Sequence, residues 1–190
     1  MNFFVTKIVE DSDVTYNLTV AGYVALALAV VTSMFKIIDM PMGGSVTLFS
    51  MLFIVLTGYW FGVRTGITTA VAYGILQLLI NPYIISIWQM LMDYIFAFGA
   101  LGLAGLFSNK KKGLIKGYIA GILGRYFFSF LSGWIFFAVY TPDFFNSAIL
   151  YSLAYNGAYI GLEAAITLIV LALPPVNEAM QAVKKLVCEA

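Results

Sequence analysis

The stretch Ser86–Gly105 places a single carboxylate, that of Asp93, inside an apolar segment long enough to cross a bilayer. At a rise of 1.5 Å per residue, Asp93 would lie roughly 10 Å from the start of this segment, within a hydrocarbon core about 30 Å thick. A charge at that depth costs about 3 kcal/mol or more unless it is paired, so such residues usually face a cavity or a partner. The sequence therefore predicts either a ligand site or a structural ion pair at Asp93.

The composition indicates an integral membrane protein with one domain, residues 1–190. Of the 190 residues, 62% are hydrophobic and 10% are charged, whereas soluble domains carry about 25% charged residues. Ten basic and nine acidic residues create no net field that would attract nucleic acid. The chain has no histidine, one cysteine and no phosphate-binding GxxxxGK[ST] motif, which argues against an enzyme, a metal site or a bound cofactor.

Hydropathy predicts an all-α bundle of six transmembrane helices, residues 18–173. The first 17 residues lack the pattern of a cleaved signal peptide and are expected to form an arm, and residues 174–190 read as an amphipathic tail that follows Pro174 and Pro175. The six apolar segments run approximately over residues 18–38, 46–62, 65–80, 86–107, 114–140 and 148–173.

Basic residues predict the orientation of the bundle, because lysine and arginine accumulate in cytoplasmic loops. With six spans, both termini share a side with loops 2–3 and 4–5, and the opposite loops hold only Lys36. The sequence therefore predicts a multi-pass plasma-membrane protein with both termini in the cytoplasm. The residues on the predicted cytoplasmic side are Lys7, Arg64, Lys110, Lys111, Lys112, Lys116, Lys184 and Lys185.

The intramembrane charges are expected to have two roles, one structural and one in ligand binding. Arg125 and Glu163 fall on consecutive predicted helices and are expected to form a structural ion pair, which would leave Asp93 for a ligand. Aromatic faces attract cations and an asparagine amide can both donate and accept, so the pattern favours a flat, cationic, hydrogen-bonding ligand. The aromatic residues expected near Asp93 in the outer half are Tyr83, Trp134, Tyr140 and Tyr151.

Ala21, Ala25 and Ala29 recur every four residues on the first predicted helix and therefore share one face. Small residues at this spacing let two helices approach closely. Taken alone, the stripe fits packing inside the bundle as well as docking of another protein.

Five motifs, in order, resemble the thiamine-specific S-component family of energy-coupling factor (ECF) transporters. They are MPMGGSVTLFSM, YGILQLLINPY, QMLMDYIFAFGALGLAGLF, RYFFSFLSGWIFF and YSLAYNG, and the resemblance covers roughly residues 20–173. It implies a six-helix, substrate-binding membrane subunit that captures thiamine from outside with high affinity. The implied partners are a membrane coupling subunit and two ATPases, with the Ala21, Ala25 and Ala29 face as the docking surface.

The resemblance also implies a set of ligand-binding positions. It carries the family's acidic residue and neighbouring tyrosine onto Asp93 and Tyr94, and its helix-five glycine onto Gly133. Two positions depart from the family: Ser129 stands where histidine is common, and Phe137 where some members have tryptophan, for which Trp134 is a candidate substitute. A thiamine precursor or analogue therefore remains an alternative ligand. The implied site comprises Tyr83, Asp93, Tyr94, Ser129, Gly133, Trp134, Phe137, Tyr151 and Asn156.

Two further functions are compatible with the sequence. A self-sufficient secondary carrier for an organic cation would need no ATPase partner, and energised uptake without ECF ATPases would favour it. An assembly subunit without a ligand is a third hypothesis, which the buried polar residues Asp93 and Asn156 disfavour.

Overall fold

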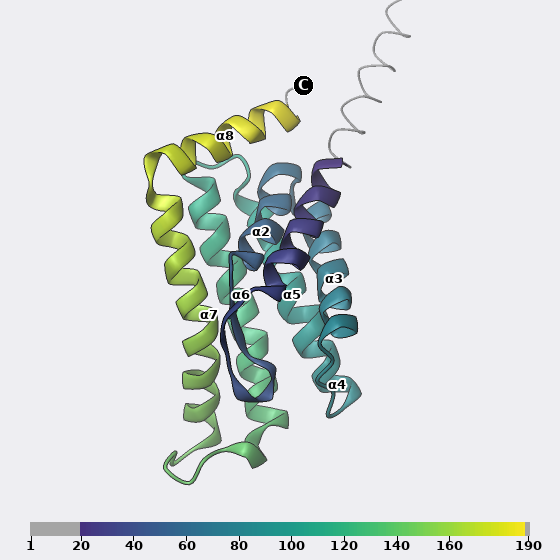
Figure 1. The fold of residues 1–190 in the computed structure, drawn as a ribbon, viewed down its shortest axis with the longest axis vertical. Coiled ribbons are helices and arrows are strands. Elements are labelled where there is room, and N and C mark those ends of the chain that lie inside the picture. Colours follow the sequence, from purple (N-terminus) through teal and green to yellow (C-terminus); the bar gives the residue numbers. More distant parts are fainter. Residues whose placement is uncertain (1–19, 189–190) are drawn as a thin grey trace, which may run out of the picture.

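The structure, a computed structural model, describes residues 20–188 and consists mainly of helices packed side by side (Figure 1). The expected N-terminal arm, residues 1–17, lies outside the described residues. The first described helix is Val20–Met34. The other elements are β1 (Lys36–Asp39), η1 (Pro41–Gly43), β2 (Ser45–Thr47), α2 (Ser50–Phe61), α3 (Val63–Ile80), α4 (Ile87–Met90), η2 (Leu91–Phe96), α5 (Ala97–Gly99), η3 (Ala100–Phe107), α6 (Gly113–Phe136), η4 (Ala138–Tyr140), α7 (Ala148–Ala172) and α8 (Pro174–Cys188).

Four helical runs in the described chain are long and apolar enough to cross a membrane. They cover Val63–Ile80, Ile87–Phe107, Gly113–Phe136 and Ala148–Ala172. The other two predicted spans correspond to shorter apolar helices, Val20–Met34 and Ser50–Phe61. The helical membrane bundle is thus confirmed, whereas the count of six spans is not. The tail expected after Pro174 and Pro175 forms the amphipathic helix α8.

An antiparallel hairpin separates the first helix from α2. Residues 36–38, which hydropathy assigns to the first helix, lie in β1, and β1 pairs with β2 through Ile38 and Val46. Gly43 at the tip has a φ of +87°, a conformation that glycine adopts without steric strain. The segment between the first helix and α2 is therefore a short hairpin, which runs beside α7 (Figure 1).

One glycine makes the turn between α2 and α3. Gly62 has a φ of +86° and is the only residue between the two helices, so the chain reverses direction within one position. Beside this turn, a β-carbon on Gly66 would lie 2.6 Å from the α-carbon of Gly58 and 2.9 Å from the carbonyl oxygen of Gly102. Glycine thus allows α2, α3 and η3 to touch at the backbone.

The first helix buries the alanine stripe inside the bundle. Ala25 and Ala29 are 3% and 0% exposed, and Ala29 belongs to the main hydrophobic core. The outward face of this helix carries Tyr23, Val24 and Val31 instead. The prediction that Ala21, Ala25 and Ala29 form a docking face is therefore wrong for this structure, because two of the three side chains offer no surface to a partner.

The two ends of the bundle differ. At one end, α8 turns away from α7 and lies across the ends of the helices (Figure 1). At the other end, a loop connects α6 to α7 (Figure 1). Lys184 of α8 donates to the backbone oxygen of Ser108 and, at 3.0 Å, to its hydroxyl. The lysine-rich 110–112 segment therefore lies at the same end as α8.

Candidate functional site

A cavity of about 330 Å³ lies between the hairpin and helices α3 to α7. Eight of the nine binding residues expected from the sequence line it, although they come from four separate parts of the chain. Their roles toward a ligand stay predictions, because the geometry records only their positions. These eight are Tyr83, Asp93, Tyr94, Ser129, Gly133, Phe137, Tyr151 and Asn156.

Asp93 enters the cavity from a π-helical segment, η2. A π-helix carries an additional residue per turn and is frequent at functional sites, since it redirects side chains that a regular helix would place elsewhere. One carboxylate oxygen of Asp93 accepts a hydrogen bond of 2.7 Å from the side-chain amide of Gln89, one turn earlier. The Ser132 hydroxyl also lies beside this carboxylate, and Asp93 lines the cavity.

Gln89 and Tyr94 hold the turn between α3 and α4 in place. The amide of Gln89 also donates to the Tyr83 carbonyl, and its oxygen accepts from the Ile85 amide, both at 3.0 Å. The Tyr94 hydroxyl donates to the Asn81 carbonyl and accepts from the Tyr83 amide, both at 2.9 Å. Tyr94 thus contributes its ring to the cavity wall, while its hydroxyl fixes the loop that carries Tyr83.

The α6 wall consists of residues spaced four apart. Arg125, Ser129, Gly133 and Phe137 all line the cavity, because residues four apart on a helix share one face. Phe137 closes this wall by stacking on Tyr83, with ring centroids 5.7 Å apart and an interplanar angle of 25°. Ser129 is buried and occupies the position of the histidine expected from the family resemblance.

Trp134 does not belong to this wall. Its side chain is 41% exposed on the outer face of α6 and stacks on Phe130 at a centroid distance of 6.2 Å. Trp134 therefore cannot replace an aromatic residue at position 137, and Phe137 itself fills that place. The reason is helical geometry, since a residue one position after Gly133 is rotated by about 100° away from the cavity.

The α7 wall is organised around Asn156, which is 5% exposed. Its side-chain nitrogen donates to the Ser152 carbonyl at 3.0 Å and to the Ser152 hydroxyl at 3.2 Å, and its oxygen accepts from Tyr159 at 2.9 Å. Gly133 permits this arrangement, because a β-carbon there would lie 3.0 Å from the Asn156 nitrogen and closer still to Ser152. The amide is therefore held in one orientation at the cavity surface.

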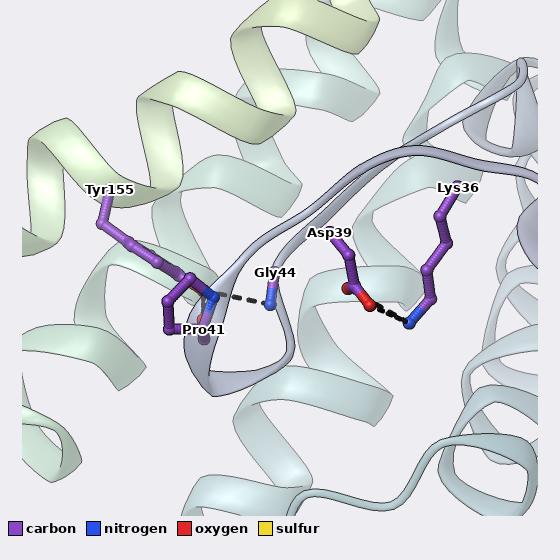
Figure 2. A network of polar contacts seen from close by, with 5 residues as sticks. All are labelled: Lys36, Asp39, Pro41, Gly44 and Tyr155. Carbon is purple, nitrogen blue, oxygen red and sulfur yellow. Dashed lines mark hydrogen bonds and ion pairs between the residues drawn. The ribbon is translucent and has the colours of Figure 1, made fainter.

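The hairpin covers one side of the cavity and is attached to α7 at its tip. The Tyr155 hydroxyl accepts from the Gly44 amide at 3.0 Å and donates to the Pro41 carbonyl (Figure 2). Along β1, Lys36 and Asp39 form an ion pair at 3.2 Å, the one salt bridge among the described residues (Figure 2). The polar backbone of η1 thus meets a polar side chain of α7.

The predicted ion pair between Arg125 and Glu163 is absent from the structure. Arg125 lines the cavity and lies over the Phe98 ring, 4.3 Å from its centroid, with no carboxylate within salt-bridge distance among the described residues. Glu163 is instead enclosed by donors from Thr47, Ser50 and Met51 at the start of α2. The prediction was wrong because the hairpin places helix-terminal amides beside Glu163, and no hydropathy pattern reveals that contact.

Sequence reasoning therefore missed two cations, Lys36 and Arg125, and several polar residues of the cavity. Arg125 is four residues before Ser129, and this spacing was the signal that could have assigned it to the cavity. The hairpin residues gave no such signal, because their approach to α7 depends on contacts more than 100 positions apart. The missed lining residues with polar side chains are Ser33, Lys36, Ser45, Thr47, Ser50, Tyr73, Gln77, Asn81, Gln89, Arg125, Ser152, Tyr155 and Tyr159.

The cavity can offer an occupant charge, aromatic faces and a fixed amide. Asp93 supplies a carboxylate, Tyr83 and Phe137 supply stacked rings, and Asn156 supplies the amide. Within the described residues, no group of three histidine, cysteine or acidic side chains could hold a metal ion. The arrangement is suited to binding a small organic molecule rather than to nucleophilic or metal-assisted chemistry.

Comparisons with known proteins place the chain in a family. Residues 19–183 match the family described as Thiamine transporter protein (Thia_YuaJ). The thiamine transporter ThiT of Bacillus subtilis (strain 168) is 35% identical, over 78% of this chain and 83% of that protein. The solved structure of ThiT from Listeria monocytogenes has a similar fold, with a TM-score of 0.63, 22% identity, and coverage of 87% of this chain and 97% of that one. The chain therefore belongs to the thiamine transporter protein family, a family of transporters and not of enzymes.

Proposed function

We propose that this protein is the thiamine-binding S-component of an ATP-driven ECF importer. The observation that carries the proposal is the cavity that combines the carboxylate of Asp93 with stacked aromatic rings and a fixed amide. Thiamine has matching parts, a cationic thiazolium ring and a neutral aminopyrimidine ring. The names of the relatives support the same ligand.

Asp93 acts in this proposal as the counter-charge of the thiazolium ring. Its carboxylate is held by Gln89, lies beside Ser132 and lines the cavity, and a carboxylate has about four acceptor positions, so it can also accept from or pair with a ligand. The positive charge of Arg125 repels a cationic ligand in the same cavity. The guanidinium group of Arg125 lies over the Phe98 ring. Aromatic faces stabilise a cation by about 0.5–2 kcal/mol each, and Tyr83 and Phe137 provide such faces in the same cavity as Asp93.

Asn156 forms a hydrogen bond with the edge of the pyrimidine ring. Its amide oxygen accepts one hydrogen bond, from Tyr159, and an amide oxygen has a second lone pair to offer. Ser129 lies one turn before Gly133 on the opposite wall and can donate or accept there. A serine is shorter than the histidine expected at that place, which supports a thiamine precursor or analogue as a second candidate ligand.

The orientation follows from the two ends of the structure. The end that carries α8 and lysines 110–112 is cytoplasmic, and the end with the hairpin tip, Tyr83 and the α6–α7 connection faces outside. Both termini are then on the inside and the ligand enters from outside. The short first helix and α2 complete six spans together with the four longer helical runs.

Uptake of thiamine against its concentration gradient needs a source of energy. The sequence has no nucleotide-binding motif, and the proposed partners are a membrane coupling subunit and two cytoplasmic ATPases. A self-sufficient secondary carrier is the alternative. Uptake of labelled thiamine should cease when the ECF ATPases are deleted, and persistent energised uptake would favour the secondary carrier.

Ligand identity is tested by native mass spectrometry of the purified protein. We expect a mass increment equal to thiamine, which isotopically labelled thiamine should exchange. Calorimetry with thiamine, its pyrimidine precursor and its thiazole precursor then ranks the candidates. If a precursor binds more tightly than thiamine, the precursor is the substrate. If none of the three compounds binds, the proposal is refuted.

A further inference from the structure

Glu163 is a buried carboxylate that α7 directs at the start of another helix. It is 3% exposed, and its oxygens accept from the Thr47 amide at 2.9 Å, the Thr47 hydroxyl at 2.7 Å, the Met51 amide at 3.3 Å and the Ser50 hydroxyl at 3.4 Å. The Thr47 and Ser50 hydroxyls also lie 2.6 Å apart and share a hydrogen bond, so at most three of the four donors act on the carboxylate at one time. The negative charge is therefore held by hydrogen-bond donors and not by a cation.

The donors around Glu163 belong to the foot of the hairpin and the first turn of α2. Phe49, at the N-cap of α2, makes no side-chain capping bond, and Glu163 of α7 fills this role from 112 positions away. A negative charge at a helix N-terminus is favourable because the free amides there carry partial positive charge. Glu163 thus joins the hairpin, α2 and α7 at one point.

The hairpin is attached to α7 a second time, two turns away. Tyr155, Tyr159 and Glu163 are spaced four apart and share one face of α7, and Gly44 lies against the first two. A β-carbon on Gly44 would lie 2.5 Å from the Tyr155 hydroxyl and 3.0 Å from the Tyr159 ring. The tip and the foot of the hairpin therefore bind the same stripe of the same helix.

The two attachments differ in strength. At the tip a neutral phenol bonds to the backbone of Gly44 and of the exposed Pro41. At the foot a buried carboxylate faces two backbone amides and two hydroxyls, and hydrogen bonds to a charged group are roughly twice as strong as neutral ones. The foot is therefore the stronger of the two attachments.

We propose that Glu163 is a positioning residue for ligand capture, the fixed anchor of the hairpin foot about which the tip moves. Glu163 does not line the cavity, whereas Thr47 and Ser50 both do. It acts through these two residues, by holding their side chains and the start of α2 against α7. This inference rests on the proposed function, since it concerns how the same cavity takes its ligand.

The first test is a double-mutant cycle between Glu163→Gln and Thr47→Val, read as thiamine affinity. Glutamine has one acceptor oxygen and turns an amide nitrogen toward donors, so we expect about tenfold weaker binding, equivalent to about 1.4 kcal/mol. The double variant should bind no more weakly than Glu163→Gln alone, because both changes break one contact. Thr167→Ala is the matched control: its hydroxyl bonds at 2.8 Å to the Glu163 carbonyl of the same helix, and we expect affinity within twofold of the parent.

The second test needs no ligand. Val46 of β2 is 1% exposed, and a cysteine there, in a Cys188→Ser background, should react slowly with a small membrane-permeant thiol reagent. Glu163→Gln should raise that rate several-fold, and Thr167→Ala should not. If the parent binds no thiamine, the proposed function fails while this labelling still tests the anchor.

The proposal is overturned if Glu163→Gln melts at a lower temperature but binds thiamine like the parent and leaves the Val46→Cys rate unchanged. Additive effects in the cycle would also overturn it, since Glu163 would then act through other residues. If Glu163→Gln does not fold, Ser50→Ala and Thr47→Val each remove one side-chain donor, and each should speed labelling at position 46.

Discussion

The two intramembrane carboxylates of this protein, Asp93 and Glu163, differ in what surrounds them. Asp93 accepts a hydrogen bond from Gln89 and lines a cavity, whereas Glu163 faces four donor groups and lies outside the cavity. The hydropathy pattern cannot distinguish them, because each is a single acid in an apolar helix. The number of protein donors around each carboxylate does distinguish them.

This difference shows two roles that a carboxylate buried in a membrane protein can have. Where protein donors hold the carboxylate away from a cavity, it stabilises the fold. Where positions remain open next to a cavity, the carboxylate can engage a small molecule. Replacing Asp93 should thus affect binding, and replacing Glu163 should affect the hairpin and the fold.

The largest effect is expected from Asp93→Asn. Removing one partner of a buried charge pair costs about 3–5 kcal/mol, which corresponds to roughly two to four decades of affinity. Asparagine keeps the shape and can still accept from Gln89, so the melting temperature should change little. Titration calorimetry with thiamine measures the loss, and the neutral pyrimidine fragment should lose much less. Unchanged thiamine affinity would show that Asp93 is a structural residue, as Glu163 is, and not a ligand-binding one.

Glu163→Ala should lower stability rather than affinity alone. It leaves the buried donors of Thr47, Ser50 and Met51 without their acceptor, at a cost of about 2–4 kcal/mol in the free energy of unfolding. Thermal unfolding in detergent measures this, and Thr167→Ala should melt close to the parent. A melting temperature equal to that of the parent would mean that the cap of α2 is dispensable.

Gly133→Ala tests the wall that faces Asp93. The new methyl group collides with Ser152 and the Asn156 amide, so α6 and α7 must separate, and thiamine affinity should fall about tenfold. Gly161→Ala is the control, since a β-carbon there meets nothing within 4 Å and alanine favours the helix. Equal affinities for the two variants would show that the approach of α6 to α7 does not shape the site.

The smallest effect is expected from Tyr155→Phe, which removes the bonds to Gly44 and Pro41 but keeps the ring. Losing a neutral hydrogen bond costs about 1 kcal/mol, so release of thiamine should quicken about fivefold. Stopped-flow tryptophan fluorescence measures this rate. A release rate unchanged in Tyr155→Phe would mean that the tip attachment does not limit exit.

The sequence by itself determined the membrane class of the protein and part of the cavity wall. Spacing by four placed Ser129, Gly133 and Phe137 on one stripe, and helix length placed Asp93 deep inside a span. These inferences succeed because helical periodicity and the hydrophobic demand of the bilayer are local properties of the chain. The family resemblance added Asn156 and Tyr151 from a distant segment.

Only the tertiary structure decided the partners of the charges and the faces of the first helix. Arg125 lies over Phe98 and not beside Glu163, and Ala25 and Ala29 face the bundle core. The hairpin sets the first outcome, because it brings free amides to Glu163 from more than 100 positions away. Which side of an apolar helix is buried depends on its neighbours, since in a bilayer both sides are equally hydrophobic.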